Sequence, residues 1–129
     1  MRALAAILFC LALLACEDEQ VAPRELDRSG EDFPVQADDS WASGPWPWLT
    51  EDPEIAGLIE IAPQSLLILH HGLGRTPLEV HCYVGFSADA TWVMPSAGNA
   101  CEVHDPLDEE ILTIRNGSGG SFYYRFVLR

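Results

Sequence analysis

Apolar and polar residues alternate along several segments in the second half of this chain. The clearest case is residues 78–86, where Leu, Val, Cys, Val and Phe occupy every second position. A period of two is typical of a half-buried β-strand, and it places Cys82 on the buried face and His81 on the exposed face. Residues 122–128 alternate in the same way. Both segments are therefore predicted strands.

Shorter segments add to this predicted β-domain. Residues 65–71 form an apolar run that ends in His-His-Gly, which suits a strand buried on both faces. Residues 111–115 also predict a strand, and the glycine-rich loop 116–120 is expected to join it to the last strand in a hairpin.

Two further segments have weaker patterns. Residues 100–104 alternate, and residues 58–61 are apolar enough to add a strand, although Asp52-Pro53-Glu54 could instead open a short helix. No long stretch has the period of an amphipathic helix. Five to seven short strands separated by turns predict an all-β fold over residues 55–129, a small antiparallel β-sandwich or barrel.

The segment before this domain has a different composition. Residues 17–54 hold 12 acids, two bases and only 11 apolar residues. Low hydrophobicity combined with charge of one sign does not offset the entropy lost when a chain folds. We therefore predict that residues 16–54 form a disordered acidic tether.

Three tryptophans, Trp41, Trp46 and Trp48, interrupt this tether, and Pro45 and Pro47 hold the chain extended around them. One interpretation is a strip that packs along the folded domain and covers a sheet edge. The other is an exposed aromatic surface that recognises sugar rings or a partner protein. We favour packing because exposed tryptophan is costly.

The first residues have the pattern of an export signal. Arg2 precedes an apolar run, Ala3 to Ala15, that is too short for a membrane-spanning helix. The run ends in Leu13-Leu14-Ala15-Cys16, which resembles the lipobox of bacterial lipoproteins. The resemblance implies that residues 1–15 are removed and that Cys16 carries a diacylglycerol thioether and an N-acyl chain such as palmitate, which anchors it in a lipid bilayer. The alternative is an ordinary secretory signal with a chance cysteine.

The residue after Cys16 indicates the membrane in which the protein resides, and the net charge excludes some classes of partner. Enterobacterial lipoproteins kept at the inner membrane typically have Asp after the lipidated cysteine, whereas this chain has Glu17, so the resemblance favours the outer membrane. Twenty acids against seven arginines and no lysine give a formal net charge of −13. This charge argues against nucleic acid as a partner, because phosphates require clustered cations, and against membrane binding through a basic patch.

Two cysteines, Cys82 and Cys101, remain after processing. In an exported chain they most simply form a disulfide. The alternative is metal ligation with the nearby His81 and His104, but zinc cysteines usually come as close pairs such as C-x₂-C, and none occurs. If their strands pair, these two histidines and nearby carboxylates could also form a surface metal site.

Motifs for catalysis are absent from the sequence. There is no Gly-x-Ser-x-Gly nucleophile elbow and no phosphate-binding loop. The acids within residues 105–110 lack the spacing of a calcium loop, so we expect a solvated turn there. We predict no enzymatic activity and no cofactor.

Residues 71–77, His-Gly-Leu-Gly-Arg-Thr-Pro, follow one apolar strand and lead into another. They resemble the H-x-L-G-x-x-P segment of small β-domains in phage tail and receptor-binding proteins. Those domains close with an asparagine-containing turn and a final strand, here Asn116 and residues 127–129. The resemblance implies a β-domain over residues 57–129.

These observations predict an envelope lipoprotein whose β-domain binds or scaffolds an envelope protein or carbohydrate without catalysis. The aromatic candidates for ligand binding are Trp41, Trp46, Trp48, Trp92, Tyr83 and Tyr123. Two alternatives stay open. One is a metal-binding protein or metal-dependent hydrolase that uses His81 and His104. The other is a structural subunit of a tail-like or envelope assembly.

Overall fold

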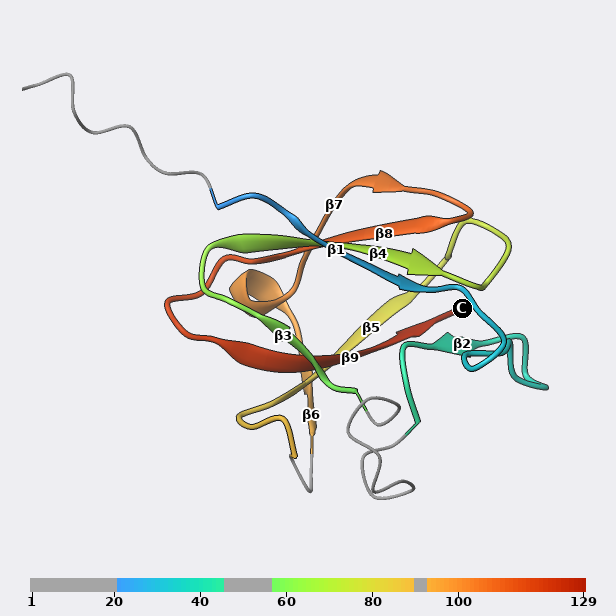
Figure 1. Cartoon of the computed structure of the whole chain (residues 1–129), viewed down its shortest axis with the longest axis horizontal. Helices are drawn as coiled ribbons and strands as arrows, with labels where there is room; N and C mark the ends of the chain where they lie inside the picture. Colours follow the sequence, from blue (N-terminus) through green and yellow to red (C-terminus); the bar gives the residue numbers. More distant parts are fainter. Residues whose placement is uncertain (1–20, 46–56, 90–92) are drawn as a thin grey trace, which may run out of the picture.

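The computed structural model describes residues 21–45, 57–89 and 93–129, and its strands form two sheets packed face to face (Figure 1). The predictions for the signal, Cys16, Trp46, Trp48 and Trp92 lie outside these ranges. The first sheet has the strand order β1, β4, β8, β7. Its strands are β1 (Arg24–Arg28), β4 (Ser65–His71), β8 (Ile111–Asn116) and β7 (Glu102–Leu107).

The second sheet is built around β9 (Phe122–Leu128). One side of β9 pairs with β5 (Val80–Gly85), which in turn pairs with β6 (Met94–Ser96). The other side pairs with β2 (Trp41–Ala42) near its end and with β3 (Ile59–Ile61) near its start. A short 3₁₀ helix, η3 (Gly98–Ala100), lies between β6 and β7.

The core lies between the two sheets and confirms the predicted all-β sandwich. Every second residue of β4 is buried, and its bounds are those predicted, but Leu66 and Ile68 on the other face are only half-buried, so the strand is not buried on both faces. The buried apolar side chains are those of Trp41, Ile59, Ile61, Leu67, Leu69, Leu73, Cys82, Val84, Leu112, Ile114, Tyr124, Phe126 and Leu128.

The predicted strand over residues 78–86 is shorter in the structure. β5 covers Val80–Gly85, with Cys82 buried and His81 exposed as expected. Leu78 and Phe86, however, are 87% and 64% exposed. The partner strand β9 ends at Leu128, opposite Val80, so Leu78 lies beyond the sandwich and no strand covers it.

The predicted hairpin between residues 111–115 and 122–128 is wrong. β8 belongs to the first sheet and β9 to the second, and the glycine-rich loop carries the chain from one layer to the other (Figure 1). The buried Asn116 side chain ties this loop down: its amide donates to the carbonyls of Ile61 and Gly120, at 3.0 and 2.8 Å. Turn residues predict that a chain reverses, but not which sheet it enters.

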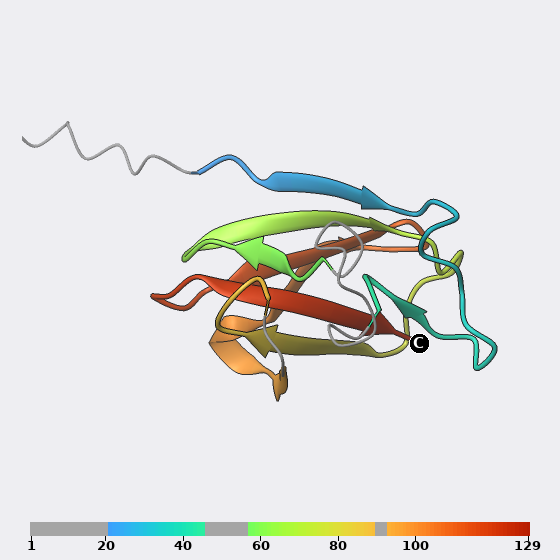
Figure 2. The ribbon, with the colours of Figure 1, turned by 60° about the horizontal axis from the view of Figure 1, so that its bottom comes forward.

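The predicted disordered tether is also wrong for residues 24–28 and 41–45. β1 pairs in parallel with β4, from Arg24 opposite Leu67 to Arg28 opposite His71, and Figure 2 shows the two strands side by side. Leu26 packs against the core. An edge strand needs few apolar side chains, because its backbone hydrogen bonds and one inward face hold it.

The two cysteines form the predicted disulfide. Cys82 in β5 is bonded to Cys101, which precedes β7, with 6.5 Å between their Cα atoms, a normal separation for a disulfide. The bond therefore joins the second sheet to the first. Closing a loop of this length contributes about 3 kcal/mol in the loop-entropy model.

Candidate functional site

A cleft of about 690 Å³ lies over the outer face of the second sheet. Its floor comes from Tyr83 of β5 and Arg125 and Val127 of β9, which alternate with the buried residues of those strands and so face away from the core. Its wall is one stretch of the N-terminal segment. The wall and rim residues are Asp32, Phe33, Pro34, Gln36, Ala37, Asp38, Ser40, Ala42, Gly44, Pro45 and Arg129.

Arg125 lies at the bottom of this cleft. Its side chain is only 6% exposed although it projects from the outer face of the sheet. Its Nε donates to the Gly44 carbonyl at 2.8 Å, so the wall is hydrogen-bonded directly to the floor. Burial lowers the pKa of Arg125, and the nearby Tyr83 works in the opposite direction. Alternation alone predicted an outward arginine and missed its burial.

Backbone pairing fixes the wall at its end nearest the sheet. The Ser43 N–H donates to the Phe126 carbonyl at 3.0 Å, and the Phe126 N–H donates to the Ser43 hydroxyl at 2.9 Å. Both partners are buried. Buried reciprocal hydrogen bonds of this kind are costly to break, so Ser43 is a fixed point of the cleft.

A local turn shapes the remainder of the wall. The Asp38 carboxylate accepts hydrogen bonds from the Ser40 hydroxyl and N–H, and these lower the pKa of Asp38. The Arg129 guanidinium lies 3.9 Å from the same carboxylate, across the mouth of the cleft. The rim therefore carries charges of both signs.

Trp41 anchors the wall from beneath. It is fully buried and lies against the imidazole of His71, with ring centroids 5.8 Å apart and an interplanar angle of 54°. This confirms packing for Trp41 and removes it from the candidates for ligand contact. Of the other aromatic candidates that the structure describes, Tyr83 lines the cleft, whereas Tyr123 lies on β9 and is not among the lining residues.

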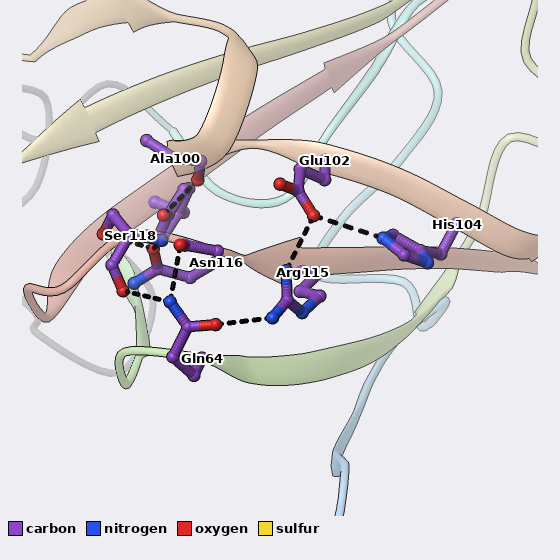
Figure 3. Close-up of polar contacts among 9 residues, drawn as sticks. Gln64, Ala100, Glu102, His104, Arg115, Asn116 and Ser118 are labelled. Atoms are coloured by element: carbon purple, nitrogen blue, oxygen red, sulfur yellow. Dashed lines mark hydrogen bonds and ion pairs between the residues drawn. The ribbon is translucent and has the colours of Figure 1, made fainter.

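A second polar cluster lies where the first sheet meets the β8–β9 loop (Figure 3). Glu102 accepts from Arg115 at 3.0 Å and contacts His104 at 3.4 Å, and these two hydrogen bonds lower the pKa of Glu102. Arg115 also donates to Gln64, whose amide donates to the carbonyls of Gly117 and Ser118. These hydrogen bonds hold the loop against the sheet, so the cluster has a structural role.

The structure does not bring the two metal candidates together. His81 lies on β5 in the second sheet and His104 on β7 in the first, so their strands do not pair. Each contacts a glutamate two residues earlier in the chain, Glu79 at 3.0 Å for His81 and Glu102 at 3.4 Å for His104. Within the described ranges, no group of three or more His, Cys, Asp or Glu side chains could hold a metal ion.

The acidic turn after β7 has a structural role as well. The Asp108 carboxylate accepts from the N–H groups of Glu110 and Ile111, at 2.9 and 2.8 Å. These bonds close the β7–β8 turn and lower the pKa of Asp108.

Comparison with known proteins adds no relative: no family model, curated protein or solved structure matches this chain. Among the residues that the structure describes, no helix is long and apolar enough to cross a membrane.

Proposed function

We propose that this chain is a lipid-anchored envelope lipoprotein whose β-sandwich is a non-catalytic binding module, with the cleft over the second sheet as its ligand site. The single observation that carries the binding role is the cleft: a concave site lined by both apolar surface and polar groups held in place has the form of a ligand site. The Leu13-Leu14-Ala15-Cys16 motif supports the anchor, and Glu17 favours the outer membrane.

The lining chemistry favours an envelope carbohydrate as the ligand. Tyr83 supplies an aromatic ring, and Val127 and Pro34 add apolar surface, which together suit the hydrocarbon face of a sugar. Gln36, Asp32 and Arg129 also line the cleft and are of the types that exchange hydrogen bonds with hydroxyl and amide groups. The cleft is also of the size that encloses small ligands.

The test uses the mature chain without its lipid and soluble cell-wall glycan fragments, with maltose as the control sugar. Two-dimensional NMR should show the shifts concentrated at Tyr83, Arg125 and Val127. Tyr83→Ala should weaken binding about tenfold because it removes the aromatic floor, whereas Tyr123→Ala, on the same sheet but outside the cleft, should change it less than twofold.

Three results would reject this assignment: no shifts at the cleft with any fragment, equal shifts with maltose, or equal losses in the two tyrosine variants. Circular dichroism of both variants confirms that each is folded before binding is compared.

A further inference from the structure

His71 is a titratable side chain buried in the core directly beneath the cleft wall. It is 3% exposed and lies at the end of β4. Its Nδ1 accepts a hydrogen bond from the Leu73 N–H at 3.3 Å, and its Nε2 lies 3.2 Å from the Asp108 carbonyl. A carbonyl only accepts, so Nε2 carries the proton and the ring is neutral.

Neither ring nitrogen has room for a second proton in this arrangement. A proton that arrives from solvent must bind Nδ1, and the Leu73 N–H then loses its acceptor. The same proton creates a positive charge on a side chain that is only 3% exposed and lies against Trp41. Uncompensated charge in a core is strongly unfavourable.

The charged neighbours do not reverse this effect. On the turn before β8, Asp108 raises the pKa of His71 through its backbone carbonyl and its charge, but its carboxylate is also engaged by two N–H groups. Glu110 contributes its backbone carbonyl to the His71 N–H. On β1, Arg28 lies opposite His71 in register. His70 is next along β4 on the other face, where it contacts Glu25. The largest influence is burial, which lowers the pKa of His71 below its ordinary value of 6.5.

Trp41 connects this histidine to the cleft. The residues on either side of it, Ser40 and Ala42, line the cleft, and so does Gly44, which accepts the hydrogen bond from Arg125. A change beneath Trp41 therefore acts on the wall that defines the site.

We propose that His71 is a pH-sensitive latch: its protonation breaks the bond to Leu73, loosens Trp41 and releases the cleft wall at residues 40–45. Only the consequence for ligand binding rests on the proposed function, because the release of the wall is a property of the fold. The neutral ring stabilises the closed wall above pH 6.5. That stabilisation is lost as the pH falls through the window below 6.5.

The test follows the folded protein by NMR from pH 7.5 to 4.5. The imidazole ¹⁵N signals of His71 should titrate below the ordinary histidine value of 6.5, and the Trp41 indole N–H should shift with the same midpoint. Hydrogen exchange of the Ser43 and Phe126 amides should also accelerate as the pH falls below 6.5, after correction for the intrinsic pH dependence of exchange. The total acceleration should be about tenfold for each pH unit by which the pKa of His71 lies below its ordinary value.

Two substitutions separate the latch from general acid effects. His71→Gln keeps a donor and an acceptor but does not titrate, so its Trp41 signal and wall exchange should stay flat over this range. The matched control, His70→Gln, should behave like the wild type. If His71→Gln does not fold, the wild-type ¹⁵N titration still decides.

The proposal is overturned if His71 titrates at an ordinary histidine value, or if Trp41 and the wall amides do not follow its midpoint. A flat glycan titration at every pH, with the latch signals intact, would instead count against the proposed function alone.

Discussion

Arg28 shows how one buried cation can hold an acidic segment in place. It is 9% exposed, its Nη1 donates to the carbonyls of Ser43 and Gly57, and its guanidinium lies 5.0 Å from the ring centroid of Phe33. These contacts connect β1 to two parts of the chain that follow it, at Ser43 and at Gly57. Burial lowers the pKa of Arg28, yet an arginine remains charged at any physiological pH.

Arg28→Met should keep most of the apolar packing but leave two carbonyls without their donor. We expect the free energy of unfolding to fall by about 2–3 kcal/mol, measured by urea denaturation. Arg24→Met is the matched control: it lies on the same strand, is exposed and donates to one carbonyl, that of Glu60, so its loss should stay below about 1 kcal/mol. Equal losses in the two variants would contradict the role given to Arg28.

Tyr124 makes a second residue-scale prediction. Its hydroxyl donates to the Ala100 carbonyl, and burial raises its pKa to about 12. An unfolded tyrosine ionises near 10, so the stability that this group supplies is present below pH 10 and is lost as the pH rises from 10 to 12. Tyr124→Phe should cost about 1 kcal/mol at pH 7 and make stability less sensitive to alkali. A wild-type and a variant that lose stability in parallel above pH 10 would disprove this.

At the scale of the elements, the alternation of apolar and polar residues predicted the positions of strands and which of their side chains face the core. Residues 65–71 and 122–128 are strands with the predicted bounds, and the inward position of Cys82 followed from alternation. β1 escaped prediction because four of its five residues are charged, and an edge strand is held by its neighbour rather than by its own composition. The cleft escaped prediction because it joins residues 32–45 to Arg125, which lies some 80 positions away in the chain.

The crossing of the β8–β9 loop depends on Asn116. Asn116→Asp has the same shape but cannot donate to the carbonyls of Ile61 and Gly120, so it should lower the free energy of unfolding by about 2–4 kcal/mol in a urea or thermal melt. Ser121→Ala, on the same loop but exposed, with its hydroxyl donating to the exposed Glu60 side chain, should change stability by less than about 0.5 kcal/mol. If the aspartate variant matches the wild type at neutral pH, the amide is not what holds the loop.

Considered as a whole, the molecule protects three edge strands of its two sheets, β1, β6 and β7. β1 is rich in charge, β6 contains Pro95, and β7 contains Pro106 with an irregular register between His104 and Leu107. Charge, proline and bulges all oppose edge-to-edge pairing of chains. This agrees with placing the proposed recognition surface on a sheet face, where the cleft lies, rather than on an open edge.

The anchor is tested on whole cells. Cys16→Ser should abolish labelling of the chain by an alkyne analogue of palmitate and release it from the membrane fraction, because several acyl chains make attachment effectively permanent. Cys10→Ser, within the apolar run of the signal, should keep both label and membrane association. A wild-type chain that carries no label, or a Cys16 variant that keeps it, would contradict the lipoprotein assignment.

The central claim is that the acidic segment ahead of the β-domain is folded onto the sandwich and builds the cleft. Hydrogen exchange of the mature full-length protein at pH 7.5, read by mass spectrometry, tests it most directly. We predict that amides of residues 26–28 and 41–43 are protected to a degree comparable with β4. Exchange of both stretches at the rate of an unstructured peptide, with β4 and β9 still protected, would contradict the account.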